Sequence, residues 1–493
     1  MTKSEKLLFS AAKNGDIKTV QTLIKQGVNV NATTPNKWTA LMLAALHGQT
    51  ETVRCLLGHR TKGHRAKRQA ANPYVTLKDS AMDAFLFAVR SGNADTVRLL
   101  LDKVSIDINH PSEYELIDYE HYTIMPTPLM LAARYGHTDV MKLLIEKGAD
   151  VSIIDNGGEN ALSLATKHGH IASVRLLFEL GLANANSADH WETPILTIAA
   201  GNGHKDLVQF LLDNGAEVNR LGGFGGCDTA IKDAVCGNHI EIVQLLLDAG
   251  ADVNLGDEID KLKPSNALPV LYMACQTYDG EKINMDMLKL LLDAGANVNA
   301  MYGDTALYQA AENGDIDAVR LLLDYGADVN LGRETPLIAA LYDGSKNTQA
   351  IVQLLLDNGA DVHRFRDIAL HSPIMLAAVN HPECLPLLID AGADINYVCR
   401  GTTDYYQYTA LLWAAEEGIT ESVKILLANG ADIHAKNKRG RTALDLAMMG
   451  QHTEIVQLLQ AAGAKNSDAI GNKDKVAEIY QQLFINTQPA SGH

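Results

Sequence analysis

LLLDAGADVN, residues 245–254, is one of a set of near-identical stretches in this chain. The others are FLLDNGAEVN (210–219), LLLDAGANVN (290–299), LLLDYGADVN (321–330) and LLLDNGADVH (354–363). Successive copies begin 31 to 45 residues apart. A sequence that repeats itself about every 20–50 residues indicates a solenoid, a propeller or an array.

A complete unit reads TPLMLAARYGHTDVMKLLIEKGAD over residues 127–150. Pro128 is tolerated in the first turn of a helix, so we expect the first helix to begin here. Gly136 and the histidine after it end that helix. Apolar residues at spacings of three and four from Val140 onward predict a second helix with one apolar stripe. Gly148 ends the second helix, because glycine adopts the left-handed conformation without strain, and an extended hairpin leads to the next unit.

One such unit cannot fold alone. Its two short helices bury too little apolar surface to offset the conformational entropy lost on ordering them. Stacking lets each unit bury its second face against its neighbour. The repetition therefore predicts an all-helical solenoid.

The pattern TPL-x-x-AA-x-x-GH…LL-x-x-GADVN resembles the ankyrin repeat, whose period is about 33 residues. The resemblance implies an all-α fold: an elongated, curved α-solenoid of about thirteen helix-turn-helix repeats with hairpin loops. The expected first helices lie near Leu7, Ala40, Ala84, Pro128, Ala161, Pro194, Ala230, Val270, Ala306, Pro336, Pro373, Ala410 and Ala443. Tetratricopeptide repeats are the alternative, but they lack the Gly-Ala-Asp hairpin.

The chain departs from the family pattern in two ways. Met42, Met130 and Ser163 stand where the family usually has a histidine after TPL. The third unit, near residues 82–109, ends in DKVSIDIN without a glycine.

We expect three regions along the chain. Residues 1–37 form an N-terminal capping repeat with a polar start, and residues 38–464 form the ankyrin repeat array. Insertions interrupt the array at 58–80, 110–125, 255–266 and 397–408. Residues 465–493 form a linker, a helix and a disordered tail. The apolar stripe of DKVAEIYQQLF favours a helix that closes the last repeat, with a partner-binding helix as the alternative.

Composition favours a cytoplasmic protein. The 493 residues carry a formal net charge of −17, which argues against general affinity for nucleic acid or anionic membranes. The six cysteines form no CxxC pair, so we expect reduced thiols. No apolar run of about 18 residues predicts a membrane span, and the start has no apolar segment of signal-peptide type. The host cytosol, for a secreted effector, and the nucleus are alternative locations.

Catalytic motifs are missing from the sequence. There is no HExxH, Walker-type, GxSxG or kinase set, and GGFGGC (222–227) is interpreted as a flexible hairpin tip. A set of histidines occupies the turn of the repeat, where we expect a structural role: His137, His170, His204, His239 and His452. We therefore expect no catalytic residues, no cofactor and no metal site, and predict a non-catalytic scaffold.

The resemblance implies that partner proteins bind at the hairpin tips and on the concave side of the first helices. In the N-terminal half, the two positions after the Ala-Ala pair of the repeat pattern are basic and partly aromatic. They hold Lys13, His47, Arg90, Arg134, Tyr135, Lys167 and His168. The C-terminal half offers Glu312, Glu416 and Glu417 instead. The hypothesis is an acidic protein or peptide held by the basic groove, with Trp38 and Trp191 at adjoining tips. Tyr405 and Tyr406 form a second candidate patch. A merely solvated face is the alternative.

Three further alternatives stay open. Long arrays of this kind occur in bacterial effectors that bind a host protein. The basic run Arg60, Lys62, Arg65, Lys67 and Arg68 in the 58–68 loop would suit nucleic-acid binding, or it is a solvated loop. Asn219, Asn254, Asn299 and Asn330 match positions that asparaginyl hydroxylases modify in some ankyrin-repeat proteins, or they satisfy hairpin backbone groups. We expect a monomer without membrane insertion.

Overall fold

The computed structural model describes residues 2–58, 73–111, 125–223, 229–256, 268–277, 282–342, 347–364, 372–399 and 407–465, with side chains from residue 82 onward in the second range. The chain divides into two compact units, Met1–Asp252 and Val253–His493. Both consist of short helices that follow one another in pairs.

The helices of the first unit form seven consecutive pairs in the described residues. They are α1 (Lys3–Asn14) and α2 (Ile17–Lys25), α3 (Ala40–Leu46) and α4 (Thr50–Gly58), α5 (Pro73–Arg90) and α6 (Ala94–Lys103), α7 (Pro128–Arg134) and α8 (Thr138–Glu146), α9 (Ala161–Lys167) and α10 (Ile171–Glu179), α11 (Ile195–Gly201) and α12 (Lys205–Asp213), α13 (Ala230–Cys236) and α14 (Ile240–Asp248).

The second unit continues the same pattern with six pairs over its described residues. They are α15 (Val270–Cys275) and α16 (Met285–Asp293), α17 (Ala306–Glu312) and α18 (Ile316–Asp324), α19 (Pro336–Tyr342) and α20 (Thr348–Asp357), α21 (Pro373–Asn380) and α22 (Leu385–Asp390), α23 (Ala410–Glu417) and α24 (Thr420–Ala428), α25 (Ala443–Met449) and α26 (Thr453–Ala461). A 3-10 turn, η1 (Pro382–Cys384), precedes α22. The strands β1 (Met301–Tyr302) and β2 (Asp304–Thr305) form a small antiparallel hairpin before α17.

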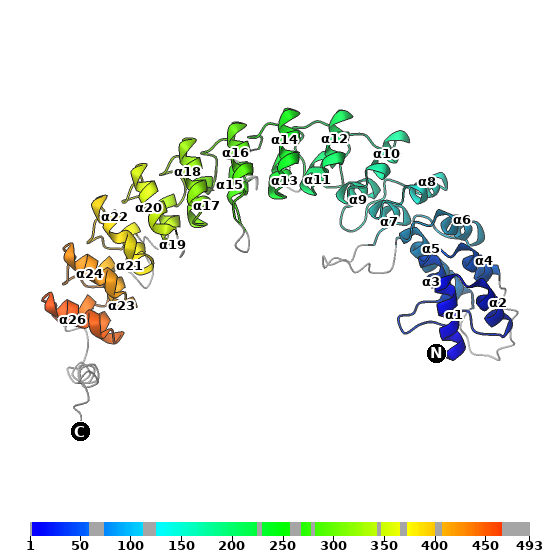
Figure 1. Ribbon diagram of the computed structural model, residues 1–493, viewed down its shortest axis with the longest axis horizontal. Coiled ribbons are helices and arrows are strands. Elements are labelled where there is room, and N and C mark those ends of the chain that lie inside the picture. The colour runs from blue at the N-terminus through cyan, green and yellow to red at the C-terminus, as the bar shows by residue number, and fades with distance from the viewer. Residues whose placement is uncertain are drawn as a thin grey trace, which may run out of the picture. The chain divides into compact units, whose positions relative to one another are not determined.

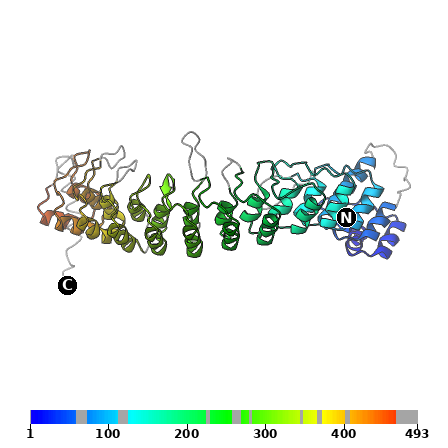
Figure 2. The same ribbon diagram turned by 90° about the horizontal axis from the view of Figure 1, so that it is seen from above.

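Within each unit the first helices of the pairs stack in one row and the second helices in another (Figure 1). The loops between pairs project from one edge of these two layers (Figure 2). The core lies between the rows. In the pair α7 and α8 it takes Ala132 and Ala133 from the first helix and Val140 and Leu144 from the second, all fully buried. The small alanines let neighbouring helices approach closely, as the repeat predicts.

The residues that replace the family's histidine have a local role at the start of the first helices. The backbone N–H of Thr39 donates to Sδ of Met42 at 3.2 Å, and the N–H of Asn160 donates to Oγ of Ser163 at 2.8 Å. Thr39 and Asn160 in turn accept from the backbone N–H of Met42 and Ser163. Each pair is a reciprocal helix cap, so Met42 and Ser163 help to cap the first helix of their repeats.

In five of the described pairs, a histidine in the turn links the pair to the one before it. Its ring Nε2 donates to a backbone carbonyl oxygen at the end of the preceding first helix, and each distance lies between 2.7 and 3.2 Å. The bonds run from His137 to Arg90, His170 to Arg134, His204 to Lys167, His239 to Gly201 and His452 to Glu416. The predicted structural role of these histidines is confirmed.

Asparagine side chains in the hairpins bond to the following repeat, whereas the turn histidines bond to the preceding one. Oδ1 of Asn299 accepts the backbone N–H of Asp328 at 2.8 Å, and its Nδ2 donates to the carbonyl oxygen of Gly326 at 3.2 Å. Asn186, Asn219, Asn254 and Asn330 make the same two bonds to the following repeat. These asparagines satisfy hairpin backbone groups, as expected; we refer to the set as the asparagine ladder.

The third pair and the insertions differ most from the regular unit. Helix α5 begins at Pro73, so the last part of the 58–80 insertion is helical. Helix α6 ends at Lys103, and its C-cap residue Val104 has an extended backbone in place of a glycine. Most of the other insertions, and all of the predicted closing helix and tail, lie outside the described residues, as do Tyr405, Tyr406 and the basic run within 58–68.

Candidate protein-binding surface

Three of the predicted basic residues lie at the same position of consecutive repeats. Arg90, Arg134 and Lys167 are the last residues of α5, α7 and α9. The backbone carbonyl of each accepts the histidine bond from the next repeat. Because the histidines fix these backbone positions, the three side chains are presented in register along one edge. We call this edge, together with the adjoining hairpins of the first unit, the first-helix surface.

Arg90 and Tyr135 come from different repeats and meet across the gap between them. The guanidinium carbon of Arg90 lies 5.4 Å from the centre of the Tyr135 ring, within cation–π range. The same ring packs nearly parallel to His137, with ring centres 6.1 Å apart and an interplanar angle of 21°. Since His137 also binds the Arg90 carbonyl, the three side chains form one assembly. Arg90 itself is exposed and offers its charge to solvent.

His168 follows Lys167 at the end of α9 and lies among positive charges. Burial, followed by the charges of Arg134, His170 and Lys167, lowers the pKa of His168 to about 4. Its Nε2 atom is buried and has no hydrogen-bond partner among the described residues. The imidazole is therefore neutral at pH 7. The nearby cations add to the effect of burial, because they oppose protonation of the ring.

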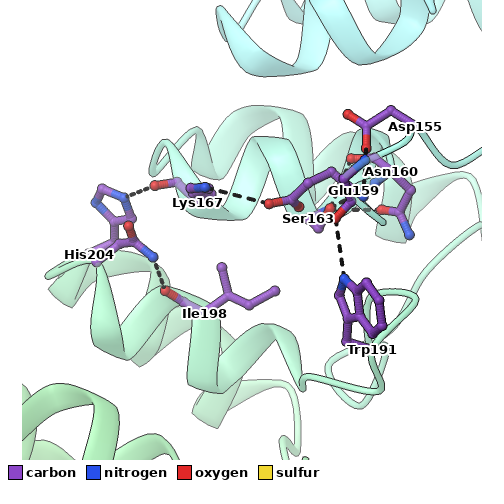
Figure 3. Close-up of polar contacts among 10 residues, drawn as sticks. Asp155, Glu159, Asn160, Ser163, Lys167, Trp191, Ile198 and His204 are labelled. Atoms are coloured by element: carbon purple, nitrogen blue, oxygen red, sulfur yellow. Dashed lines mark hydrogen bonds and ion pairs between the residues drawn. The ribbon is translucent and has the colours of Figure 1, made fainter. Parts of the chain in front are cut away.

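Lys167 belongs to a small polar network that reaches the hairpin (Figure 3). Its ammonium lies 3.6 Å from a carboxylate oxygen of Glu159, and both side chains are partly exposed. Such partly exposed pairs stabilise little, typically up to about 1 kcal/mol. Glu159 thus offsets part of the Lys167 charge. The pattern of residues after the Ala-Ala pair does not reveal this ion pair, because Glu159 lies in the preceding hairpin.

Trp191 is held in place although it is 47% exposed. Its indole N–H donates to the carbonyl oxygen of Gly157 in the preceding hairpin at 3.2 Å (Figure 3). The ring lies directly over Gly158, where an added Cβ would fall 2.3 Å from the indole nitrogen. A large aromatic ring fixed at a hairpin tip loses little conformational entropy when a partner covers it.

The other predicted residues contribute less to this surface. Trp38 is half-buried and packs against Phe87, with ring centres 5.0 Å apart, so it joins two repeats. His47 is exposed and donates from Nδ1 to the carbonyl oxygen of Leu43 in its own helix, at 3.0 Å.

Sequence reasoning missed a set of exposed apolar side chains on neighbouring loops of the same unit. Their exposed fractions are 47% for Met125, 41% for Ile154 and 43% for Leu221, close to that of Trp191. For Ile154 and Leu221 the available signal was an apolar residue in a loop that otherwise carries polar residues and Gly. Exposed apolar residues that gather on neighbouring loops favour a protein-binding role.

A metal site, a reactive thiol and a membrane-spanning helix each place requirements on the described residues. In the ranges that the structure covers, no three His, Cys, Asp or Glu side chains are placed to hold a metal ion. Cys384 is buried, and burial raises its pKa to about 12, so its thiol is a poor nucleophile. No helix in the described part is both long and apolar enough to span a bilayer.

Paired helices, hairpins joined by asparagines and an exposed polar–aromatic edge define a repeat protein of the ankyrin class. A family model described as ankyrin repeats (3 copies) matches residues 8–112, 114–189, 181–257, 255–333, 330–399 and 374–470. The chain belongs to the ankyrin-repeat family, whose repeats are generally protein–protein interaction modules and whose fold is generally non-catalytic.

Several curated proteins are similar over part of the chain. The "Probable E3 ubiquitin-protein ligase XBOS33" of Oryza sativa subsp. japonica is 36% identical over 25% of this chain and 22% of the ligase. An L-asparaginase of Dirofilaria immitis is 34% identical over 19% of this chain and 16% of its own length. The ankyrin repeat and KH domain-containing protein mask-1 of Caenorhabditis elegans is 30% identical over 43% of this chain and 8% of its own. The chain thus covers less than a quarter of each of these relatives.

Proposed function

We propose that the protein is a non-catalytic scaffold whose first-helix surface binds an acidic segment of a partner protein. The observation that carries the proposal is the row Arg90, Arg134 and Lys167, which the turn histidines hold in register. A partner that follows the stacking direction would meet one cation per repeat.

The aromatic and apolar groups beside this row define the rest of the partner. Trp191 and Ile154 offer exposed apolar surface on the adjoining hairpins, and Tyr135 supports the Arg90 guanidinium. Arg, Tyr and Trp are the residue types most enriched at interface hot spots. An extended acidic peptide with interspersed apolar side chains therefore fits the surface better than a purely acidic one.

The test is charge reversal at two adjacent positions of the row, Arg90→Glu with Arg134→Glu, followed by affinity purification from the source cell and mass spectrometry. We expect loss of the acidic partner, because two attractions become repulsions. The matched control is Arg98→Glu with Lys142→Glu, which makes the same charge change at exposed positions on the second helices α6 and α8. A partner list that is the same for both double variants would contradict the proposal.

A further inference from the structure

The second unit carries a surface of opposite character around α15, α17 and the β1–β2 hairpin. Tyr272 of α15 and Tyr302 of β1 lie side by side, with ring centres 6.4 Å apart and planes inclined by 55°. Tyr302 is 38% exposed, and Tyr272 is partly exposed. Two inclined aromatic faces at the surface can accept a cation.

Two carboxylates lie on the elements next to these rings, because Asp304 pairs with Tyr302 across the β1–β2 hairpin and α17, which carries Glu312, packs against α15. Glu312, at the end of α17, accepts from Nε2 of Gln309 at 2.8 Å and from the hydroxyl of Tyr308 at 3.4 Å. Asp304 of β2 accepts the backbone N–H of Glu334 at 3.1 Å, which ties the hairpin to the loop before α19. These bonds fix the carboxylates in place and leave them capacity for further donors, because a carboxylate has about four acceptor positions.

The charges of the same carboxylates act on tyrosines from two neighbouring repeats. Burial, then the negative charges of Asp304 and Glu312, raise the pKa of Tyr272. Burial, then Glu312, Glu334 and Asp304, raise the pKa of Tyr308. The same acids act on both rings, which lie on different repeats. We refer to Tyr272, Tyr302, Asp304, Tyr308 and Glu312 as the acidic–aromatic cluster.

We propose that the acidic–aromatic cluster binds an arginine-rich segment of a partner protein. A guanidinium is the best match, because it stacks on an aromatic face and donates two parallel hydrogen bonds to a carboxylate. Tyr272 and Tyr302 provide the face, and Asp304 and Glu312 provide the acceptors. This inference rests on the proposed role as a protein-binding scaffold, but it concerns a different surface and a partner segment of opposite charge.

The cluster combines carboxylates with neighbouring aromatic rings. Asp317 and Asp324 of α18 are exposed acidic residues of a second helix and lie outside the cluster. A general attraction of cations to a chain of net charge −17 would not distinguish these positions from the cluster. The experiment is therefore built on this comparison.

The experiment measures fluorescence anisotropy of a labelled peptide that alternates arginine and glycine, titrated with the full chain at physiological salt. The reference peptide carries citrulline in place of arginine, which keeps the shape and removes the charge. We expect the arginine peptide to bind, and Asp304→Asn with Glu312→Gln to weaken it about tenfold or more, since two charge-assisted bonds are lost. Asp317→Asn with Asp324→Asn, which removes the same charge from α18, is expected to change the affinity less than about twofold.

A second variant tests the aromatic part without touching charge. Tyr302→Ser replaces an exposed ring in strand β1, and we expect it to weaken binding of the peptide about threefold or more through loss of one cation–π contact. Circular dichroism confirms that each variant is folded. Equal weakening by the cluster and α18 variants, no effect of Tyr302→Ser, or no binding of the arginine peptide would each overturn the inference. The Arg90→Glu and Arg134→Glu chain is expected to bind this peptide no less tightly, so failure here is separable from failure of the basic surface.

Discussion

His168 is the residue of the first-helix surface whose protonation the fold opposes. Its ring is half-buried, its Nε2 is enclosed, and Arg134, Lys167, His170 and the more distant His204 all add positive potential. The cost of protonation is therefore a property of the folded chain and disappears on unfolding. A negatively charged partner beside Arg134 and Lys167 would reverse part of this effect and raise the pKa of His168.

The pH dependence follows from the sign of the shift. The folded chain holds His168 at a pKa of about 4, below the value of about 6.5 for an exposed histidine. The unfolded chain thus binds more protons between these two values, and the stabilisation, complete above about pH 6.5, is lost as the pH falls toward 4. We expect the ring protons of His168 to titrate near pH 4 in NMR spectra. We also expect His168→Gln to flatten the acid side of the stability curve. Titration near pH 6.5 would contradict this.

At the scale of one element, the turn between the helices of a pair depends on a glycine for two reasons. Gly136 has a φ of 70°, in the left-handed region, and a Cβ there would lie 2.5 Å from Nδ1 of His170. Gly148, at the end of α8, has a φ of 92° but open space around it. Gly136 therefore meets both a left-handed backbone and a close imidazole ring, whereas Gly148 meets the left-handed backbone alone.

We expect Gly136→Ala to destabilise the fold more than Gly148→Ala. Gly148→Ala meets only the left-handed backbone cost, about 1–2 kcal/mol. Gly136→Ala adds a clash with the imidazole or loss of its bond to the Arg134 carbonyl, another ~1 kcal/mol or more. Urea unfolding of both variants measures the difference. In a His170→Ala background the difference is expected to shrink, and an unchanged difference would assign the cost to another contact.

The regular elements were largely predictable, and the surface only in part. Helix periodicity and the Gly136 and Gly148 positions predicted α7 and α8, because these signals are local. The contact of Arg90 with Tyr135 and the pairing of Lys167 with Glu159 join residues from different elements, so spacing alone did not reveal them. The acidic–aromatic cluster was missed for the same reason, because it joins residues of α15, the β1–β2 hairpin and α17 that come together only through stacking.

For the whole molecule, stacking makes each repeat depend on its neighbours. Contacts in each unit join adjacent pairs, as α16 with α18 and α18 with α20. Leu322 of α18 is fully buried in this stack. A repeat array is approximately a sum of repeat stabilities and nearest-neighbour terms, so damage to one repeat should spread to its neighbours before it reaches distant ones.

Hydrogen exchange with mass spectrometry tests this dependence. Leu322→Ala should cost about 2–5 kcal/mol by leaving a cavity in the second unit. We expect faster exchange in α15 to α20 and unchanged exchange in α1 to α6. Loss of protection spread evenly over both units would mean that the chain unfolds as one cooperative body.

The asparagine ladder also gives the chain a direction. Asn219 can complete its two bonds only when Gly250 and Asp252, in the following repeat, are in place. During synthesis from the N-terminus, the asparagine of such a hairpin can make these two bonds only after about thirty more residues have left the ribosome. Until then, each hairpin of the ladder exposes unsatisfied backbone groups near the growing end of the nascent chain, and these are the groups that a chaperone would bind.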